Sequence, residues 1–332
     1  MDQTLGMTER EAQIAEFLRR AGWGPAQRRI LAADASFRRY DRMELAHKTA
    51  VLMDAPPPKE DVRPFIRIAR HLTGLGYSAP RIYAEDSEHG LLLLEDLGDA
   101  TFTRLLAAGA DESELYDLAM DLLIDLHRRN APCTAPIYDE QKLLTEASLL
   151  TDWYAPAIGA ELTSTQRAEY LEIWRGILPL ANLMPPTLVL RDFHVDNLMR
   201  IEGRKGIAQC GLLDFQDAVI GPITYDLASL LEDARRDVSP DLAARLKARY
   251  LAAFPELSHQ DFAASWACLA AQRHAKVIGI FTRLCRRDGK PNYLHHIPRV
   301  WRLLESHLGH PGLAPLGRWL DRHLPNRITP KP

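Results

Sequence analysis

Cysteine is scarce in this sequence. The 332 residues include four, at positions 133, 210, 268 and 285. They lie far apart and form no Cys-x-x-Cys pair, which argues against both a zinc site and a disulfide framework. Buried free thiols are therefore expected.

The sequence also lacks a basic excess and any long apolar run. Its formal net charge is -3 at pH 7, whereas proteins that bind nucleic acid usually carry a clear positive excess. No stretch of 18 apolar residues is present, and the start of the chain is polar and acidic, unlike a signal peptide. We therefore predict a cytoplasmic protein that binds neither nucleic acid nor a membrane. The oligomeric state is unknown from sequence.

The elements that are present predict an α+β protein with two lobes. The apolar fraction is 46% and the charged fraction 26%, as in ordinary globular proteins, and a chain of this length usually divides in two. The runs "DASFRRYDRM" and "KTAVLMDAPPP" read as a β-hairpin. Amphipathic helices dominate after Gly98. We expect an N-terminal strand-rich lobe over 1–95, a hinge over 96–99 and a helical lobe over 100–332.

The most informative stretch runs from residue 188 to 226. It reads as a short apolar strand (188–190), a polar loop and a return strand (198–201), which predicts a β-hairpin. A further apolar strand, 211–213, leads directly to an aspartate. Polar side chains are thus expected at the ends of these strands.

The spacing of these polar residues suits phosphoryl transfer. Kinase-like folds use an Asp at the acceptor hydroxyl, an Asn five residues later on Mg²⁺, and an Asp after a nearby strand, also on Mg²⁺. Asp192, Asn197 and Asp214 match that pattern, and Mg²⁺ prefers oxygen ligands of this kind. A solvated loop rich in turn-forming residues is the alternative. The additional Asp226, which opens a helix after Gly-Pro, favours the functional interpretation.

Four segments resemble one family. "LRDFHVDN", "LLDFQDAVIGPITYDLAS", "LLLLEDLGD" and "LIDLHRR" are similar to the aminoglycoside phosphotransferase and choline kinase family. This resemblance implies a two-lobed protein-kinase-like fold that uses ATP and Mg²⁺. The lobe over 1–95 would then bind the nucleotide, and the helical lobe over 100–332 would carry the catalytic loop and the acceptor site. Within the family, "MDAPPPKEDVRPF" and "QRHAKVIGIFTRLCRRDGKPNYLHHIPRVW" look like the bacterial kinases that phosphorylate N-acetylmuramate and N-acetylglucosamine at the anomeric hydroxyl. A sugar kinase of peptidoglycan recycling is the implied function.

The resemblance also implies roles for individual residues. Asp192 matches the catalytic aspartate, Asn197 and Asp214 the two metal ligands, and Asp226 the aspartate that braces the catalytic loop. Two further sets are implied for the nucleotide: the connector residues Glu95, Asp96 and Leu97, through their backbone groups, and the phosphate-covering loop Ser36, Phe37, Arg38 and Arg39. For the connector, a simple strand end is the alternative.

The sequence departs from the family pattern at three places. The phosphate-covering loop contains no glycine, so Arg38 or Arg39 is expected to supply charge there. Leu190 stands where relatives have a structural histidine. The lysine that ends the third strand in relatives aligns with Met53, because Lys48 lies too early. The candidates for a substitute cation are Arg39, Arg63 and Arg67.

The acceptor site is the least defined part. His194 and Asp217 flank the catalytic residues and are candidates for sugar contacts, with a loop-stabilising role as the alternative. Arg273, Lys276 and Arg283 form a cationic row on one late helix, which suits a sugar carboxylate or is simply a solvated surface. Such a row disfavours a polycationic aminoglycoside. An aminoglycoside phosphotransferase or another small-metabolite kinase, and a pseudokinase-like ATP-binding regulatory module, remain alternatives.

Overall fold

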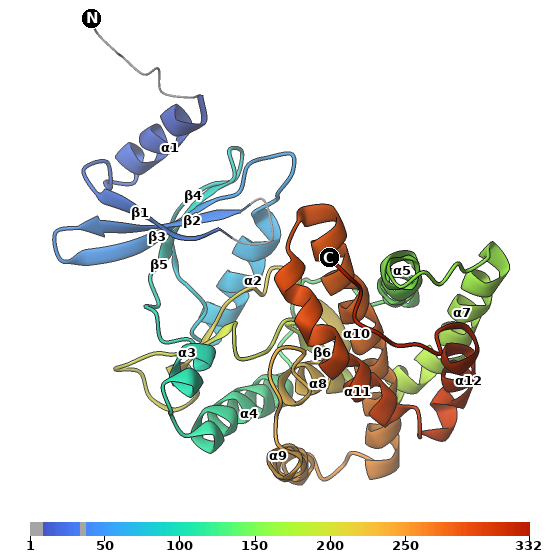
Figure 1. Cartoon of the computed structure of the whole chain (residues 1–332). Coiled ribbons are helices and arrows are strands. Elements are labelled where there is room, and N and C mark those ends of the chain that lie inside the picture. The colour runs from blue at the N-terminus through green and yellow to red at the C-terminus, as the bar shows by residue number, and fades with distance from the viewer. Residues whose placement is uncertain (1–8, 34–37) are drawn as a thin grey trace, which may run out of the picture. The chain divides into compact units, whose positions relative to one another are not determined.

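The computed structural model describes residues 9–33 and 38–332 (Figure 1). It comprises two compact units, which are described separately. Unit 1 contains the described residues up to Ala110 together with Asp196–Asp217, and unit 2 contains Asp111–Val195 and Ala218–Pro332. The lobe boundary expected at 96–99 is a different division and stays a prediction. Within the described ranges, no helix has both the length and the apolar character needed to cross a membrane.

Unit 1 is built on a five-stranded antiparallel sheet with the order β1-β2-β3-β5-β4. Its strands are β1 (Gln27–Ala33), β2 (Arg39–Leu45), β3 (Lys48–Asp54), β4 (Ile82–Asp86) and β5 (Leu91–Glu95). The hairpin expected from sequence is confirmed as the β2–β3 pair, with Leu45 opposite Lys48. Strand β1 was not foreseen, because its charged start hides the alternating pattern that identifies strands.

Helix α1 (Glu9–Arg20) covers one face of this sheet. Successive strand residues point to opposite faces, and the face toward α1 takes every second residue of the two central strands. The resulting core consists of Ile14, Phe17, Leu18, Met43, Ala50, Leu52, Leu91 and Leu93. The intervening residues of β3 and β5 therefore point to the opposite face of the sheet.

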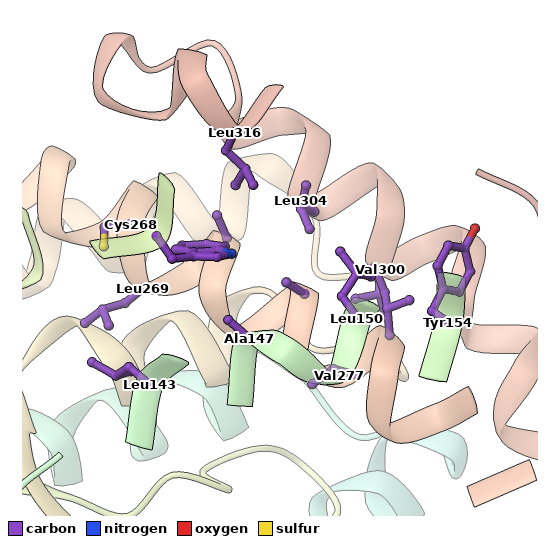
Figure 2. Packing of buried hydrophobic residues seen from close by; sticks show 14 of the residues in the cluster. Leu143, Ala147, Leu150, Tyr154, Cys268, Leu269, Val277, Val300, Leu304 and Leu316 are labelled. Atoms are coloured by element: carbon purple, nitrogen blue, oxygen red, sulfur yellow. The ribbon is translucent and has the colours of Figure 1, made fainter. Parts of the chain in front are cut away.

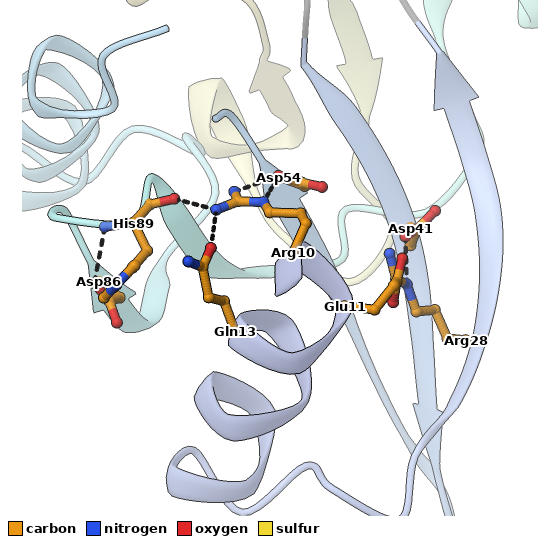
Figure 3. Close-up of polar contacts among 8 residues, drawn as sticks. All are labelled: Arg10, Glu11, Gln13, Arg28, Asp41, Asp54, Asp86 and His89. Atoms are coloured by element: carbon orange, nitrogen blue, oxygen red, sulfur yellow. Dashed lines mark hydrogen bonds and ion pairs between the residues drawn. The ribbon is translucent and has the colours of Figure 1, made fainter. Parts of the chain in front are cut away.

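Charged side chains tie α1 to the sheet (Figure 3). Arg10 donates through Nε to Asp54 at 3.0 Å and through Nη1 to the His89 carbonyl at 2.8 Å. Arg28 lies 2.5 Å from Asp41 and 2.8 Å from Glu11. Because the Asp41 carboxylate is fully buried, its charge depends on compensation by its arginine partners, Arg28 and Arg39.

The other elements among the described residues of unit 1 are two helices, one 3-10 turn and a second small sheet. They are α2 (Arg63–Gly74), α3 (Phe102–Ala107), β7 (Leu198–Arg200), η3 (Gly206–Gln209) and β8 (Cys210–Leu212). Strands β7 and β8 are antiparallel, with Leu198 opposite Leu212.

The hairpin expected between 188–190 and 198–201 is wrong. Strand β6 (Pro186–Val189) pairs with β9 (Val219–Pro222) in unit 2, and β7 pairs with β8 in unit 1. Val189 and Val219 lie opposite each other and both belong to the core of unit 2. Burial of these apolar side chains therefore determines the pairing, and proximity in sequence does not.

Unit 2 is mainly helical. Its helices are α4 (Glu112–Arg129), α5 (Glu140–Leu149), α6 (Ala155–Ala157), α7 (Ser164–Ile177), α8 (Thr224–Leu231), α9 (Pro240–Ala253), α10 (His259–Asp288), α11 (Ile297–His307) and α12 (Ala314–His323). Shorter turns are η1 (Leu150–Tyr154), η2 (Leu178–Leu183), η4 (Pro291–His296) and η5 (Pro311–Leu313).

Helix α10 is the centre of unit 2. It is 30 residues long, capped by the Ser258 side chain at its start and by Gly289 in a left-handed conformation at its end. Figure 2 shows side chains of α5 and η1, such as Ala147 and Leu150, packed with Leu269 of α10 and Val300 of α11. Since most of α10 is buried, charged residues in its middle lie inside the protein.

Candidate active site

Unit 1 contains a cavity of about 280 Å³ beside its sheet, near the lower end of small-molecule pockets. One wall is apolar and comes from the face of the sheet that α1 does not cover, including Val51 and Leu94. Met199 and Leu213 contribute a second apolar wall. The full lining is Leu31, Tyr40, Val51, Phe65, Pro80, Leu94, Glu95, Asp96, Leu97, Gly98, Asn197, Met199, Leu213 and Asp214. Two apolar walls with a polar edge suit a flat heterocycle.

The connector residues predicted to bind the nucleotide line this cavity. Their acidic side chains have other partners: Glu95 lies 2.5 Å from Arg204, and Asp96 lies 2.8 Å from Arg42. Arg42 also donates to the Gly98 carbonyl at 3.1 Å and so fixes the connector. The predicted role of Glu95, Asp96 and Leu97 is therefore confined to their backbone groups. Arg42 was not identified from sequence, because its partners lie more than 50 residues away.

Asn197 and Asp214, the predicted metal ligands, lie together at the polar edge of the cavity. The Asn197 amide nitrogen is 3.5 Å from Asp214 Oδ2, and the Leu213 N–H donates to the Asn197 carbonyl at 2.9 Å. Gln216 donates to Asp214 Oδ1 at 2.6 Å. Asp214 has a φ of 55°, a conformation uncommon outside glycine that clusters at functional sites. An amide oxygen and a carboxylate form a donor set that fits Mg²⁺.

The predicted phosphate-covering loop is described only in part. Ser36 and Phe37 lie outside the described residues. Arg38 precedes β2, and its Nε lies 3.0 Å from Glu60 Oε2. Arg39 instead lies 3.0 Å from Asp41. The two arginines thus have different partners, and the sequence had not separated them.

In unit 2, Asp226 binds the backbone that leads into the catalytic loop. The N–H groups of Leu190 and Arg191 donate to its two carboxylate oxygens at 2.6 and 2.8 Å. Burial raises the pKa of Asp226 to about 7, against the opposing effect of these two hydrogen bonds. Arg191 has a φ of 71°, which the bracing by Asp226 helps to maintain. The next residue, Asp192, is thereby presented from a constrained turn.

Positive charges surround Asp192 in unit 2. Burial alone would raise the pKa of the Asp192 carboxyl, but Lys276, His194, Arg191 and Arg273 outweigh it and hold the pKa below its ordinary value. The carboxylate is therefore ionised at neutral pH, as a group that accepts or orients a proton must be.

Glu146 joins these cations in a buried network that sequence reasoning missed. The Glu146 carboxylate pairs with Arg191 and lies 3.3 Å from Lys276 Nζ. Lys276 Nζ also lies 3.3 Å from the Tyr225 hydroxyl, and the Tyr138 hydroxyl donates to Glu146. Burial would raise the pKa of Glu146, yet Lys276 and Arg191 keep it low. No local motif marks this residue, because its partners come from three other elements.

The predicted acceptor residues fall into different environments. His194 is buried, with Arg235 Nη1 3.4 Å from its Nε2. Arg273 and Lys276 are buried, which excludes the solvated helix surface for these two; Arg273 donates to Ser229 at 2.8 Å. Arg283 is partly buried, and burial lowers its pKa. Asp217 is exposed and belongs to unit 1.

Arg235 was not identified from sequence. It packs over the Phe281 ring of α10 at 5.6 Å, in addition to its contact with His194. Its backbone N–H donates to Asp233 at 2.8 Å. Only the three-dimensional structure shows that this arginine contacts a residue of the catalytic loop.

Comparisons with known proteins agree with this chemistry. Residues 27–262 match the model of the phosphotransferase enzyme family. An N-acetylmuramate/N-acetylglucosamine kinase of Pseudomonas aeruginosa is 41% identical over 90% of this chain and 90% of its own. One of Caulobacter vibrioides is 37% identical over 96% of this chain and 98% of its own.

Solved structures show the same fold at low sequence identity. A choline kinase from Cryptosporidium parvum has a TM-score of 0.59 and 13% identity, covering 93% of this chain and 99% of that one. A streptomycin–ATP–APH(2'')-IIa ternary complex has a TM-score of 0.56 and 20% identity, covering 87% and 97%. The expected α+β fold class of kinase type is thereby confirmed.

Proposed function

The chain belongs to the phosphotransferase enzyme family, and we propose that it transfers the γ-phosphoryl group of ATP to the anomeric hydroxyl of N-acetylmuramate or N-acetylglucosamine. The observation that carries this proposal is that a chain with Asp192, Asn197 and Asp214 in the kinase spacing is 37% and 41% identical, over nine tenths of its length, to kinases named for these sugars.

The nucleotide half of the reaction uses unit 1. The adenine base would occupy the apolar cavity beside Val51, with its edge toward the backbone of the connector. Asn197 and Asp214 would hold Mg²⁺, which neutralises charge on the phosphates when bound. The streptomycin complex, which contains ATP, supports the choice of nucleotide.

The acceptor half uses unit 2. Asp192 would accept a hydrogen bond from the anomeric hydroxyl and orient its oxygen in line with the γ-phosphorus. Lys276 and Arg273 would keep Asp192 ionised, and Asp226 would hold the turn that presents it. Alignment and charge stabilisation provide most of the rate in phosphoryl transfer, so little covalent help from the protein is needed. His194 and Arg283 of unit 2 remain proposed sugar contacts, as does Asp217, which belongs to unit 1.

A cytoplasmic location fits this role in peptidoglycan recycling. All four cysteines are free thiols in the structure, and free thiols are usual in reducing compartments.

A substrate panel tests the proposal. ATP consumption is measured with Mg²⁺ and, in separate reactions, N-acetylmuramate, N-acetylglucosamine, choline and kanamycin. We expect turnover with the two amino sugars and background rates with choline and kanamycin. Turnover with kanamycin alone would assign an aminoglycoside kinase. ATP binding without transfer to any acceptor would instead support the regulatory module.

A further inference from the structure

The third strand of the sheet lacks the cation that kinase folds normally place beside the phosphates. In the Val-Ala-Ile-Lys pattern, the lysine that contacts the α- and β-phosphates follows the small pocket residue by two positions. Here Val51 lines the cavity, and Met53, two residues later on the same face, is 1% exposed. The side chain of Lys48 points to the opposite face of the strand and is exposed. The positive charge must therefore come from another element.

We propose that Arg38, held by Glu60, supplies the charge that binds the nucleotide phosphates in place of the third-strand lysine. Arg38 Nε lies 3.0 Å from Glu60 Oε2, and Arg38 Nη1 lies 3.9 Å from Asp214 Oδ1. This inference rests on the proposed function, because it takes Asp214 as a ligand of the nucleotide's Mg²⁺.

The position of Arg38 along the chain supports this assignment. It precedes β2 and lies two residues before Tyr40, which lines the cavity. The alternation of side chains along a strand therefore places both residues on the same face. The side chains of Arg38 and Glu60 are only 16% and 14% exposed, so their pairing is better shielded from water than that of a surface ion pair. In kinases the lysine is paired with a glutamate that fixes its orientation. Glu60, just before α2, provides the equivalent carboxylate.

The other candidate arginines are directed elsewhere. The side chain of Arg39 points to the other face of β2, and it lies 3.0 Å from the buried Asp41. Arg63 is 75% exposed and lies 2.8 Å from Asp61. Arg67 follows the cavity residue Phe65 by two positions on α2, so about 200° of helix rotation separates the two side chains. Of the four, Arg38 alone combines the cavity face with proximity to Asp214.

The test compares ligands with and without phosphates. Binding of MgATP and of adenosine is measured by calorimetry for the wild type, Arg38→Gln, Arg38→Lys and Glu60→Gln. We expect Arg38→Gln to weaken MgATP binding by roughly 10- to 100-fold, the range for a lost hydrogen bond to a charged group, with adenosine binding unchanged. Arg38→Lys should retain most of the affinity, and Glu60→Gln should show a smaller loss for MgATP only. Arg70→Gln, an exposed α2 arginine paired with Glu85, is the control.

A double variant that moves the positive charge back to the third strand provides a second test. In the double variant Arg38→Gln/Met53→Lys, the cation returns to the third strand, and we expect MgATP affinity to rise above that of Arg38→Gln alone. MgATP binding by Arg38→Gln within twofold of the wild type would overturn the inference. So would an equal loss of adenosine binding, which indicates a structural role. If Arg38→Gln does not fold, Glu60→Gln decides between the same outcomes. A wild type that binds MgATP but phosphorylates no sugar contradicts only the proposed function.

Discussion

At the scale of single residues, the account depends on how Asp192 stays ionised inside the protein. A buried carboxylate is normally driven toward its neutral form. Lys276 of α10 has the largest opposing effect, and His194, the adjacent Arg191 and Arg273 of α10 add to it, so that together they reverse that tendency. The same α10 residues were predicted from sequence as a row that meets the sugar. Their burial indicates that they act at least in part through Asp192.

Replacing Lys276 by Met should therefore shift the pH dependence of catalysis. Loss of its positive charge raises the pKa of Asp192, so Asp192 is protonated at a higher pH than in the wild type. The acid limb of kcat/KM, which reports groups of the free enzyme, should move to higher pH. Lys205→Met, which removes an exposed lysine, should leave the profile in place. A uniform loss of rate at all pH values would contradict the role of Lys276 in keeping Asp192 ionised.

The site residues that sequence identifies are those with local spacing. Asp192, Asn197, Asp214 and Asp226 carry their pattern within one stretch. The structure brings Asn197 next to Asp214 and Asp226 onto the Leu190 N–H, and the four roles stay predictions. Glu146 has no such pattern, because its partners lie on separate elements. Sequence reasoning fails there since it detects neighbours along the chain and not across the core.

At the scale of elements, α10 organises unit 2 through close packing. A Cβ added at Gly279 would lie 2.3 Å from the Leu149 carbonyl carbon, so the helix and the end of α5 approach through this glycine. Conversely, the short strands β6 and β7 were misassigned because strands of three or four residues carry no periodic signal of their own. The hydrophobic core in which each strand is buried determines its pairing partner.

Gly279→Ala should destabilise the protein despite the higher helix propensity of alanine. Alanine gains at most about 1 kcal/mol in a helix, whereas overpacking against backbone costs about 1–3 kcal/mol. Gly176→Ala in α7, where no atom lies within 4 Å of the added Cβ, should instead be neutral or stabilising. Thermal unfolding of both variants checks the signs. Equal Tm changes would show that propensity alone governs both sites.

Glu232 connects three helices at the other side of α10. Its Oε2 lies 2.8 Å from His274 Nε2 and 2.7 Å from His307 Nε2, while Trp266 donates to Oε1 at 2.6 Å. Lys247 of α9 lies 3.8 Å from Oε1. Burial alone would raise the pKa of Glu232, but its hydrogen bonds with the two histidines hold the pKa well below the ordinary 4.5.

The stability contributed by Glu232 should depend on pH in a defined direction. A depressed folded-state pKa stabilises the fold above the unfolded value of 4.5, and this contribution is lost as pH falls through the folded-state pKa. Glu232→Gln should cost on the order of 1–3 kcal/mol at neutral pH, with a smaller difference from the wild type below pH 4.5. Denaturant unfolding at several pH values measures this. Glu256→Gln, at an exposed site, is the control, and a gap that does not narrow in acid would contradict the role.

At the scale of the whole molecule, composition and the order of elements were sufficient to predict the α+β class, since alternating strands and long amphipathic helices are visible in the sequence. The kinase-type fold followed from the family motifs. The division of the chain was harder. Residues 196–217 join the N-terminal residues in unit 1, and a linear reading assigns them to the C-terminal lobe. A segment that packs with a distant part of the chain in this way carries no pattern in its own sequence that would reveal it.

Nucleotide binding should stabilise the fold in a metal-dependent way. A ligand that binds only the native state adds about 2.7 kcal/mol at 100 times its Kd, so MgATP should raise Tm. Removing the metal with EDTA should reverse most of this shift, because Asn197 and Asp214 would no longer hold the phosphates through Mg²⁺. In Asp214→Asn, EDTA should have little further effect. A wild-type shift unaffected by EDTA would exclude the proposed metal role.

The most direct test of the central claim is phosphoryl transfer by Asp192→Asn. The variant preserves the shape of the side chain and removes its charge. We expect transfer from ATP to N-acetylmuramate to fall by about 10²–10⁴-fold, the usual contribution of a positioned proton acceptor, with the Kd for MgATP within roughly twofold of the wild type. A loss of activity below about tenfold, or an equal loss of MgATP affinity, would contradict the assignment of Asp192 as the residue that orients the acceptor hydroxyl.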